Sequence, residues 1–124
     1  RYGIQLWQAG FDGAMIYAYQ HSMGSIWNDF DHAIYRDHGL AYPTTNGVID
    51  TIAWEGLREG IDDVRYLSTL ERIVKEQENN SAIAQELQRA AKYLTDLKVA
   101  KEVEPHKVRA EIIEHILKLN NAAS

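Results

Sequence analysis

The chain has 124 residues, of which 45% are hydrophobic and 25% charged, with no cysteine and a formal net charge of −5. This composition is typical of one folded domain, and it excludes a disordered chain, a cysteine nucleophile and a cysteine zinc site. The negative charge, without a basic stripe, argues against nucleic-acid binding, and no apolar run approaches the ~20 residues that span a membrane.

The first half of the chain mixes helical and extended patterns. Apolar spacing predicts a helix over residues 1–11, which the turn pair Asp12-Gly13 ends. The apolar run over residues 14–19 predicts a strand buried on both faces, as in a parallel sheet. Residues 20–38 show no period and predict a long loop, and a second short strand is expected over residues 39–42. Because the chain reads as structured almost from Arg1, we expect it to be cut from a longer one.

The second half is helical. A long helix is expected to begin near Asp50 or Thr51, either of which could be the N-cap, and its apolar stripe runs as far as Val74. Gly56 and Gly60 lie one turn apart in it, and we expect another backbone to pack closely against them, because each glycine costs about 1 kcal/mol relative to alanine. Two amphipathic helices are expected to follow, over residues 81–97 and 105–119.

Charged side chains offer two candidate clusters, and both have a plain structural explanation. Residues 29–32 (DFDH), with the pair Asp37-His38, carry oxygen and imidazole ligands that could hold a divalent cation. Their spacing fits no dedicated metal loop, so a solvated acidic loop is the favoured interpretation, and we expect no metal and no cofactor. On the long helix the spacing predicts an ion pair between Arg58 and Asp62, and it leaves open a buried pair from Arg58 or Glu55 to the neighbouring strand.

Aromatic residues are concentrated near the start of the chain. Sugar sites are commonly built from aromatic rings, which cover the apolar face of a pyranose, and from polar neighbours that bond its hydroxyls. Tyr19, Trp27 and Tyr42 lie at a strand end or in a loop, and the sequence leaves both a core role and a sugar-binding role open for them. Three other aromatic residues are expected to be core: Trp7, Tyr17 and Trp54.

Two segments carry a resemblance to a known family. The residues 42–47 (YPTTNG) and 51–67 (TIAWEGLREGIDDVRYL) resemble the last strand and helix of glycoside hydrolase family 123 and its uncharacterised relatives. Asp12-Gly13 before a strand, and residues 27–29 (WND) in the next loop, are similar as well. The likeness covers roughly residues 1–75, whereas the segment beyond Asn80 matches only in being helical.

The resemblance implies an α-rich α/β fold, the last two strand–helix units of a (β/α)8 barrel followed by two amphipathic helices. Its strands seven and eight would be residues 14–19 and 39–43. Residues 1–77 would form the closing quarter of the barrel, and residues 78–124 a helical extension packed on it. A complete barrel needs ~250 residues, so the chain could hold only part of one.

The resemblance also implies a function. Family members are retaining, hexosaminidase-like enzymes in which the substrate's acetamido group is the nucleophile and an Asp-Glu pair assists it. That pair lies on an earlier strand, so no catalytic residue is carried over, and Glu55 and Arg58 match helix positions that look structural. The positions that would line the carbohydrate site are Tyr19, Trp27, Asn28, Asp29 and Tyr42.

The expected function is therefore that of a C-terminal fragment of a glycoside hydrolase acting on N-acetylhexosamine-containing glycans, inactive by itself. Its expected partners are the carbohydrate substrate and the rest of the parent barrel, with no nucleic acid and no membrane. The alternative is a non-catalytic carbohydrate-binding or helical interaction module. We expect a soluble protein, and the sequence leaves a secreted or periplasmic location open.

Overall fold

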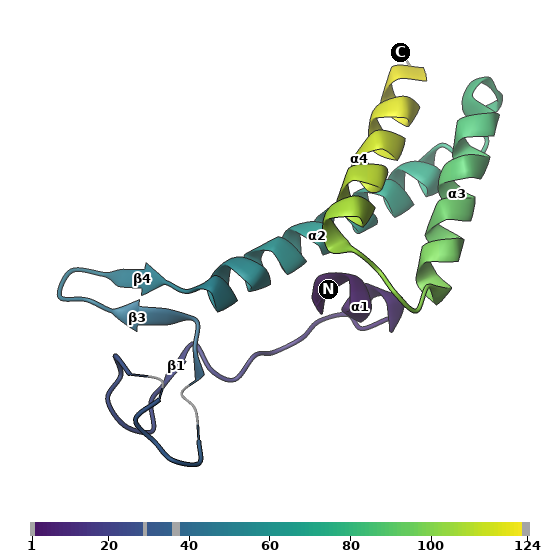
Figure 1. Ribbon diagram of the computed structural model, residues 1–124. Helices are drawn as coiled ribbons and strands as arrows, with labels where there is room; N and C mark the ends of the chain where they lie inside the picture. The colour runs from purple at the N-terminus through teal and green to yellow at the C-terminus, as the bar shows by residue number, and fades with distance from the viewer. Residues whose placement is uncertain (1, 29, 36–37, 123–124) are drawn as a thin grey trace. The chain divides into compact units, whose positions relative to one another are not determined.

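The computed structural model describes residues 2–28, 30–35 and 38–122. This part of the chain is α-rich, with four α-helices, two small antiparallel two-stranded sheets and no evident barrel (Figure 1). The elements in order are α1 (Tyr2–Gln8), β1 (Gln20–His21), β2 (His38–Gly39), β3 (Ala41–Pro43), β4 (Val48–Asp50), α2 (Ile52–Glu76), the 3-10 turn η1 (Ser81–Ile83), α3 (Ala84–Val99) and α4 (Pro105–Ala122).

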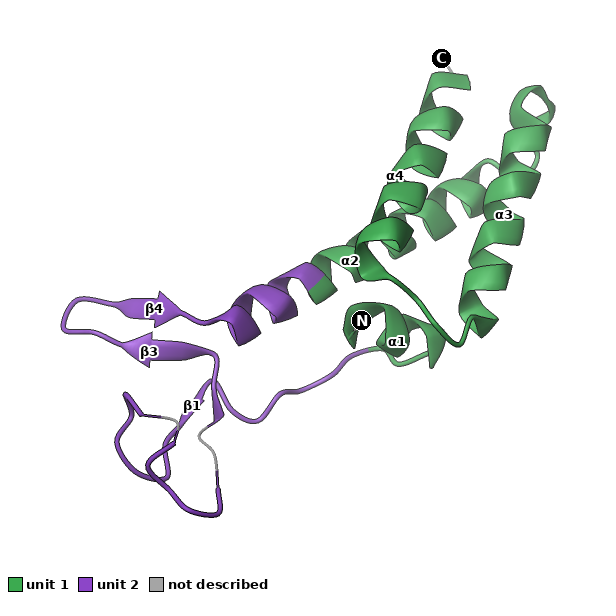
Figure 2. Cartoon of the chain, in the orientation of Figure 1, with its two compact units in different colours: residues 1–12, 60–124 green, residues 13–59 purple. Residues whose placement is uncertain are grey.

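The chain forms two compact units, and the boundary between them falls within α2 (Figure 2). The helical unit comprises residues 1–12 and 60–124, and the sheet unit comprises residues 13–59. Each unit takes its character from its sequence. Long amphipathic stripes build the first, whereas short strands joined by loops build the second.

The helical unit holds nearly all of the buried apolar side chains of the described residues. The predicted helices are confirmed, because side chains spaced three and four residues apart on each helix face one common core. The largest of the fully buried side chains come from α1, α2 and α4: Ile4, Leu67, Leu70, Ile112 and Leu119. Trp7, which was expected to be core, is buried with them.

The start of α2 and its glycines follow the sequence expectations in part. Thr51 is the N-cap, because its Oγ1 accepts a hydrogen bond from the Trp54 amide at 3.2 Å, while Asp50 ends β4. The expected close backbone approach occurs at Gly60, where α1 places Gly3 so tightly against the Gly60 carbonyl that a Cβ at Gly3 would clash with it, while a Cβ at Gly60 would lie 3.2 Å from the Gly3 amide nitrogen. Gly56 has open space around it among the described residues, so the close packing does not extend there.

Two polar contacts within the helical unit join segments distant in sequence. The Gln8 side-chain amide donates to the Leu97 carbonyl at 2.6 Å and to the Ala100 carbonyl at 3.0 Å. These bonds tie α1 to the C-terminal end of α3, where the Leu97 carbonyl also accepts from the Ala100 amide at 3.2 Å. Arg109 on α4 donates to Asp63 on α2 at 2.6 Å, and the Asp63 side chain is only 3% exposed. The buried ion pair thus lies between two helices, in contrast to the exposed pairs along α2.

The sheet unit departs from the sequence prediction. Residues 14–19 form no strand, and the prediction of a strand buried on both faces is wrong for the described chain. Met15 is 97% exposed and Tyr17, expected in the core, is 72% exposed. A strand of this kind needs a hydrogen-bonding neighbour on each side and a covering layer on each face, and the described residues supply neither.

The strands that do form are short and antiparallel. Within the predicted loop, β1 pairs with β2, so that Gln20 lies opposite Gly39 and His21 opposite His38. The second predicted strand is confirmed as β3, which pairs with β4 instead of with residues 14–19. The expected turn after Tyr42 closes this hairpin, because the Thr44 amide donates to the Gly47 carbonyl at 2.8 Å.

Apolar side chains of the sheet unit are mostly exposed. Ala41 is its one buried apolar residue among those described, and Trp54, expected in the core, is only partly buried. Large side chains that stand open to solvent include Met15, Tyr17, Trp27, Phe30, Ile34, Tyr35, Val48, Ile49 and Ile52. The described part of the sheet unit therefore exposes much of its apolar surface.

Candidate functional site

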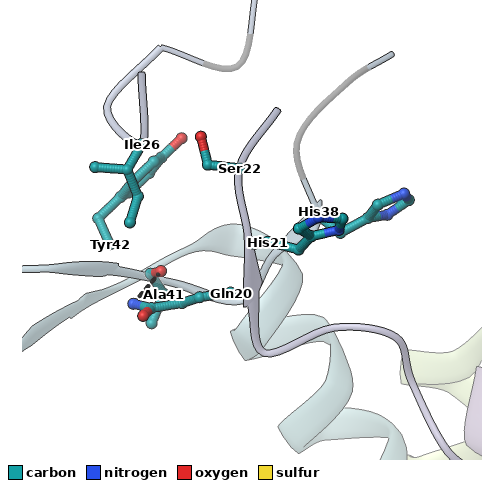
Figure 3. A pocket seen from close by; sticks show the side chains of 8 residues that line it. Gln20, His21, Ser22, Ile26, His38, Ala41 and Tyr42 are labelled. Atoms are coloured by element: carbon teal, nitrogen blue, oxygen red, sulfur yellow. Dashed lines mark hydrogen bonds between the residues drawn. The ribbon is translucent and has the colours of Figure 1, made fainter. Parts of the chain in front are cut away.

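A shallow pocket lies in the sheet unit where β1, β2 and β3 come together (Figure 3). Its free volume of ≈ 10 Å³ accommodates about one water molecule, far less than the several hundred Å³ of a typical small-molecule site. The Gln20 side chain spans its floor and donates to the Ala41 carbonyl at 2.8 Å. The lining combines polar groups with a ring and two aliphatic side chains: Gln20, His21, Ser22, Ile26, His38, Gly39, Ala41 and Tyr42.

Of the predicted site residues, Tyr42 lines this pocket, and Trp27, which does not line it, contacts Tyr42. The ring of Trp27 stacks on that of Tyr42, with centroids 5.5 Å apart and an interplanar angle of 12°. Trp27 is 56% exposed, and Tyr42 is half-buried on β3. Stacking fixes the orientation of both rings, so the pair presents an ordered aromatic surface beside polar groups of the pocket. Such a surface suits the C–H face of a sugar ring.

The remaining predicted site residues are placed differently. Tyr19 is half-exposed and lies edge-on to Trp54, with centroids 6.2 Å apart. The Asn28 side-chain oxygen accepts a hydrogen bond from the Phe30 amide at 3.2 Å and so shapes its own loop. Neither residue lines the pocket. Asp29 lies outside the described residues.

Three residues of the pocket region form a cluster that was not predicted from the sequence, which gave His38 as a candidate cation ligand of the acidic loop, Tyr17 as a core residue and no role for His21. His21 and His38 face each other across β1 and β2, and the Tyr17 hydroxyl lies 3.0 Å from His21 Nδ1. The Tyr17 ring is edge-on to both imidazoles, at 5.4 Å from His21 and 6.0 Å from His38. No local signal could have found this cluster, because it depends on the pairing of two short strands that a long loop separates.

The acidic loop shows no metal cluster. No three of the histidine and carboxylate side chains in the described parts of the chain lie close enough to share an ion. Asp31 accepts a hydrogen bond from the Ser25 amide and closes a turn. Asp29 and Asp37, the other carboxylates of the predicted cluster, lie outside the described residues.

The helical unit contains a second depression, an open groove at the corner between α3 and α4. Its free volume is ≈ 410 Å³, and its lining mixes apolar side chains with three glutamates and one lysine. None of the aromatic residues that the sequence singled out lies there, and we therefore place the candidate site in the sheet unit.

Shifted pKa values occur next to this groove. Tyr93 is partly buried, and burial raises its pKa well above the usual range, with the hydrogen bond and charge of Glu111 adding to the effect. The Tyr93 hydroxyl donates to the Val108 carbonyl at 3.3 Å. The ring of His115 lies 4.9 Å from that of Tyr93, and burial, followed by the charge of Lys118, lowers the His115 pKa. Tyr93 and His115 thus lie where α3 contacts α4, and neither of them lines the groove.

None of the described helices combines the length and apolarity needed to cross a membrane. Comparison with protein-family models, with curated proteins and with solved structures finds no match for this chain. The functional conclusion therefore comes from the residues and their geometry.

Proposed function

We propose that the chain is a carbohydrate-contacting segment of a larger glycoside hydrolase that acts on N-acetylhexosamine-containing glycans, and that it is not catalytic by itself. The observation that carries the proposal is the stacked pair of Trp27 and Tyr42 beside a polar pocket. The pocket alone is too small for a sugar, so the segment would supply one wall of a site.

The exposed apolar surface of the sheet unit supports the existence of a larger parent. Exposed apolar side chains such as Phe30, Ile34 and Ile49 would stabilise the protein only if another surface covered them and removed them from water. In the parent, further strand–helix units of a (β/α)8 barrel, supplied by the rest of the protein, would cover these side chains. Residues 78–124 would be a helical extension on the outside of that barrel.

The state of the carboxylates supports an inactive segment. A substrate-assisted hexosaminidase needs an adjacent Asp-Glu pair at its binding face. In this chain the adjacent carboxylates Asp62 and Asp63 both form ion pairs. Asp62 lies 3.2 Å from Arg65, and Asp63 is buried against Arg109. A catalytic acid must be accessible to the substrate, so the proposal places the acidic pair in another part of the parent.

Fluorescence titration tests the carbohydrate contact. Oligosaccharides of N-acetylglucosamine or N-acetylgalactosamine, added to the 124-residue chain, should change tryptophan emission, and Trp27→Phe should abolish the change. Trp7→Phe is the matched control, because Trp7 is buried in the helical unit and its removal should leave the response intact. A response that survives Trp27→Phe would refute the contact.

Hydrolysis tests the second half of the proposal. The chain should release no product from aryl N-acetylhexosaminides, while a longer protein that includes it should. Sustained turnover by the chain alone would show that it is a catalyst in its own right.

A helical interaction module is the second candidate, and one observation favours it. The helical unit has a continuous core of its own, so it could fold and bind a protein partner without any barrel. This candidate replaces the first if no N-acetylhexosamine oligosaccharide perturbs Trp27.

A further inference from the structure

The pocket region contains a pair of histidines that the proposed function does not use. His21 on β1 and His38 on β2 are directly opposed in an antiparallel pair. Directly opposed residues place their side chains on the same face, with Cβ atoms about 4.5–5.5 Å apart. Both imidazoles line the pocket, and Figure 3 shows them close together at one side of it. Neither ring is fully buried, so an ion in solvent can reach them.

A contact with Tyr17 indicates which nitrogen of the His21 ring could bind a metal ion. Its hydroxyl oxygen lies 3.0 Å from His21 Nδ1, within hydrogen-bonding distance. When Nδ1–H donates to this oxygen, the lone pair of His21 Nε2 is left free. Metal-ligating histidines are commonly held in this way, with the second ring nitrogen donating to an oxygen acceptor outside the coordination sphere.

The remaining space suits the other ligands of an ion. The free volume beside the two rings accommodates about one water molecule. Zinc sites with an incomplete set of protein ligands complete their coordination with water. Since no third histidine or carboxylate joins the pair among the described residues, water would have to supply the rest of the coordination sphere.

We propose that His21 and His38 form a two-histidine site for a borderline divalent transition metal such as Zn²⁺ or Ni²⁺, with Tyr17 as the outer hydrogen-bond partner of His21. Imidazole nitrogen selects this class of ion, whereas Mg²⁺ and Ca²⁺ require oxygen ligands. The chain contains no cysteine, so no thiolate competes for the metal.

The metal site does not rest on the proposed function. Carbohydrate contact is measured at Trp27, and metal binding at the two imidazoles, so either can fail alone. Metal binding also requires that β1 and β2 are paired as described, because this pairing brings the two imidazoles together.

Calorimetric titration of the full 124-residue chain with NiCl2 or ZnCl2 tests the proposal. We expect one ion per chain, and no binding of MgCl2. His21→Asn and His38→Asn should each weaken binding at least about tenfold, and Tyr17→Phe should weaken it by about tenfold, the lower end of outer-shell effects. His106→Asn is the control, since this exposed histidine belongs to α4 and its loss should leave binding unchanged.

Proton–carbon NMR of the unsubstituted chain provides a measurement that does not depend on the folding of a variant. Addition of Zn²⁺ should shift the imidazole signals of His21 and His38 and leave those of His32 and His106 in place. The proposal is overturned if no ion binds saturably, if the shifts fall on other histidines, or if His21→Asn and His38→Asn bind as tightly as the unsubstituted chain.

Discussion

The buried ion pair between Asp63 and Arg109 gives the strongest stability prediction. Arg109→Met removes the guanidinium that lies 2.6 Å from a carboxylate only 3% exposed, and leaves that carboxylate buried without its charged partner. Breaking a buried pair in this way costs about 3–5 kcal/mol. Arg65→Met is the matched control, because Arg65 pairs with the neighbouring Asp62 at the surface, where such pairs contribute about 0–1 kcal/mol.

Urea unfolding followed by far-UV circular dichroism measures both free energies, since the helices dominate that signal. The double variant Asp63→Leu with Arg109→Met should recover most of the loss, because no unpaired charge stays buried. A loss below about 1 kcal/mol for Arg109→Met, or one equal to that of Arg65→Met, would refute the reasoning.

Three further predictions concern the helices. Gly3→Ala places a methyl group against the Gly60 carbonyl and should lower the urea midpoint. Gly56→Ala has open space around it and should raise the free energy of unfolding by about 1 kcal/mol. A Gly3→Ala chain more stable than the Gly56→Ala chain would contradict the packing. Gln8→Leu removes two hydrogen bonds to the end of α3 and should cost about 1 kcal/mol for each in the same assay, and an unchanged midpoint would show that they contribute nothing. The pKa of His115 in the folded chain lies below its ordinary value of about 6.5, so the unfolded chain binds the proton more readily. The contribution of His115 to the free energy of unfolding is therefore present above that pH and is lost as the pH falls. In mildly acid buffer the urea midpoint should fall less for His115→Phe than for the unsubstituted chain, and equal losses would contradict the assignment.

The helices could be predicted because their signals are local. The stripe from Ile52 to Val74 has a period that only a helix accommodates, Pro105 marks the first residue of α4, and Thr51 carries the side chain that caps α2. Even the tight packing at Gly60 followed from one local fact, the cost of a glycine inside a helix.

The strands could not be predicted in the same way. Residues 14–19 have the composition of a buried strand, but a strand forms only where another chain segment offers its hydrogen-bonding edge. The first pairing begins at Gln20, whose partner lies on the far side of a long loop. Apolar composition therefore identified a segment suited to burial and not the partner that would bury it.

The candidate site, too, could be predicted only in part. Aromatic composition pointed to Trp27 and Tyr42, and the structure stacks them. The cluster around His21 depends on strand pairing, and the ion pair of Asp63 with Arg109 joins residues 46 positions apart. Contacts of that range have no signature in a single sequence.

We propose that this chain is one segment of a larger glycoside hydrolase, and the intact mass of the native gene product, with its complete coding sequence, is the most direct test. We expect a product well above the 14.2 kDa of this chain, with further strand–helix units and an adjacent Asp-Glu pair in the added sequence. A native product of 14.2 kDa would contradict it, and the exposed aromatic surface of the sheet unit would then need another explanation.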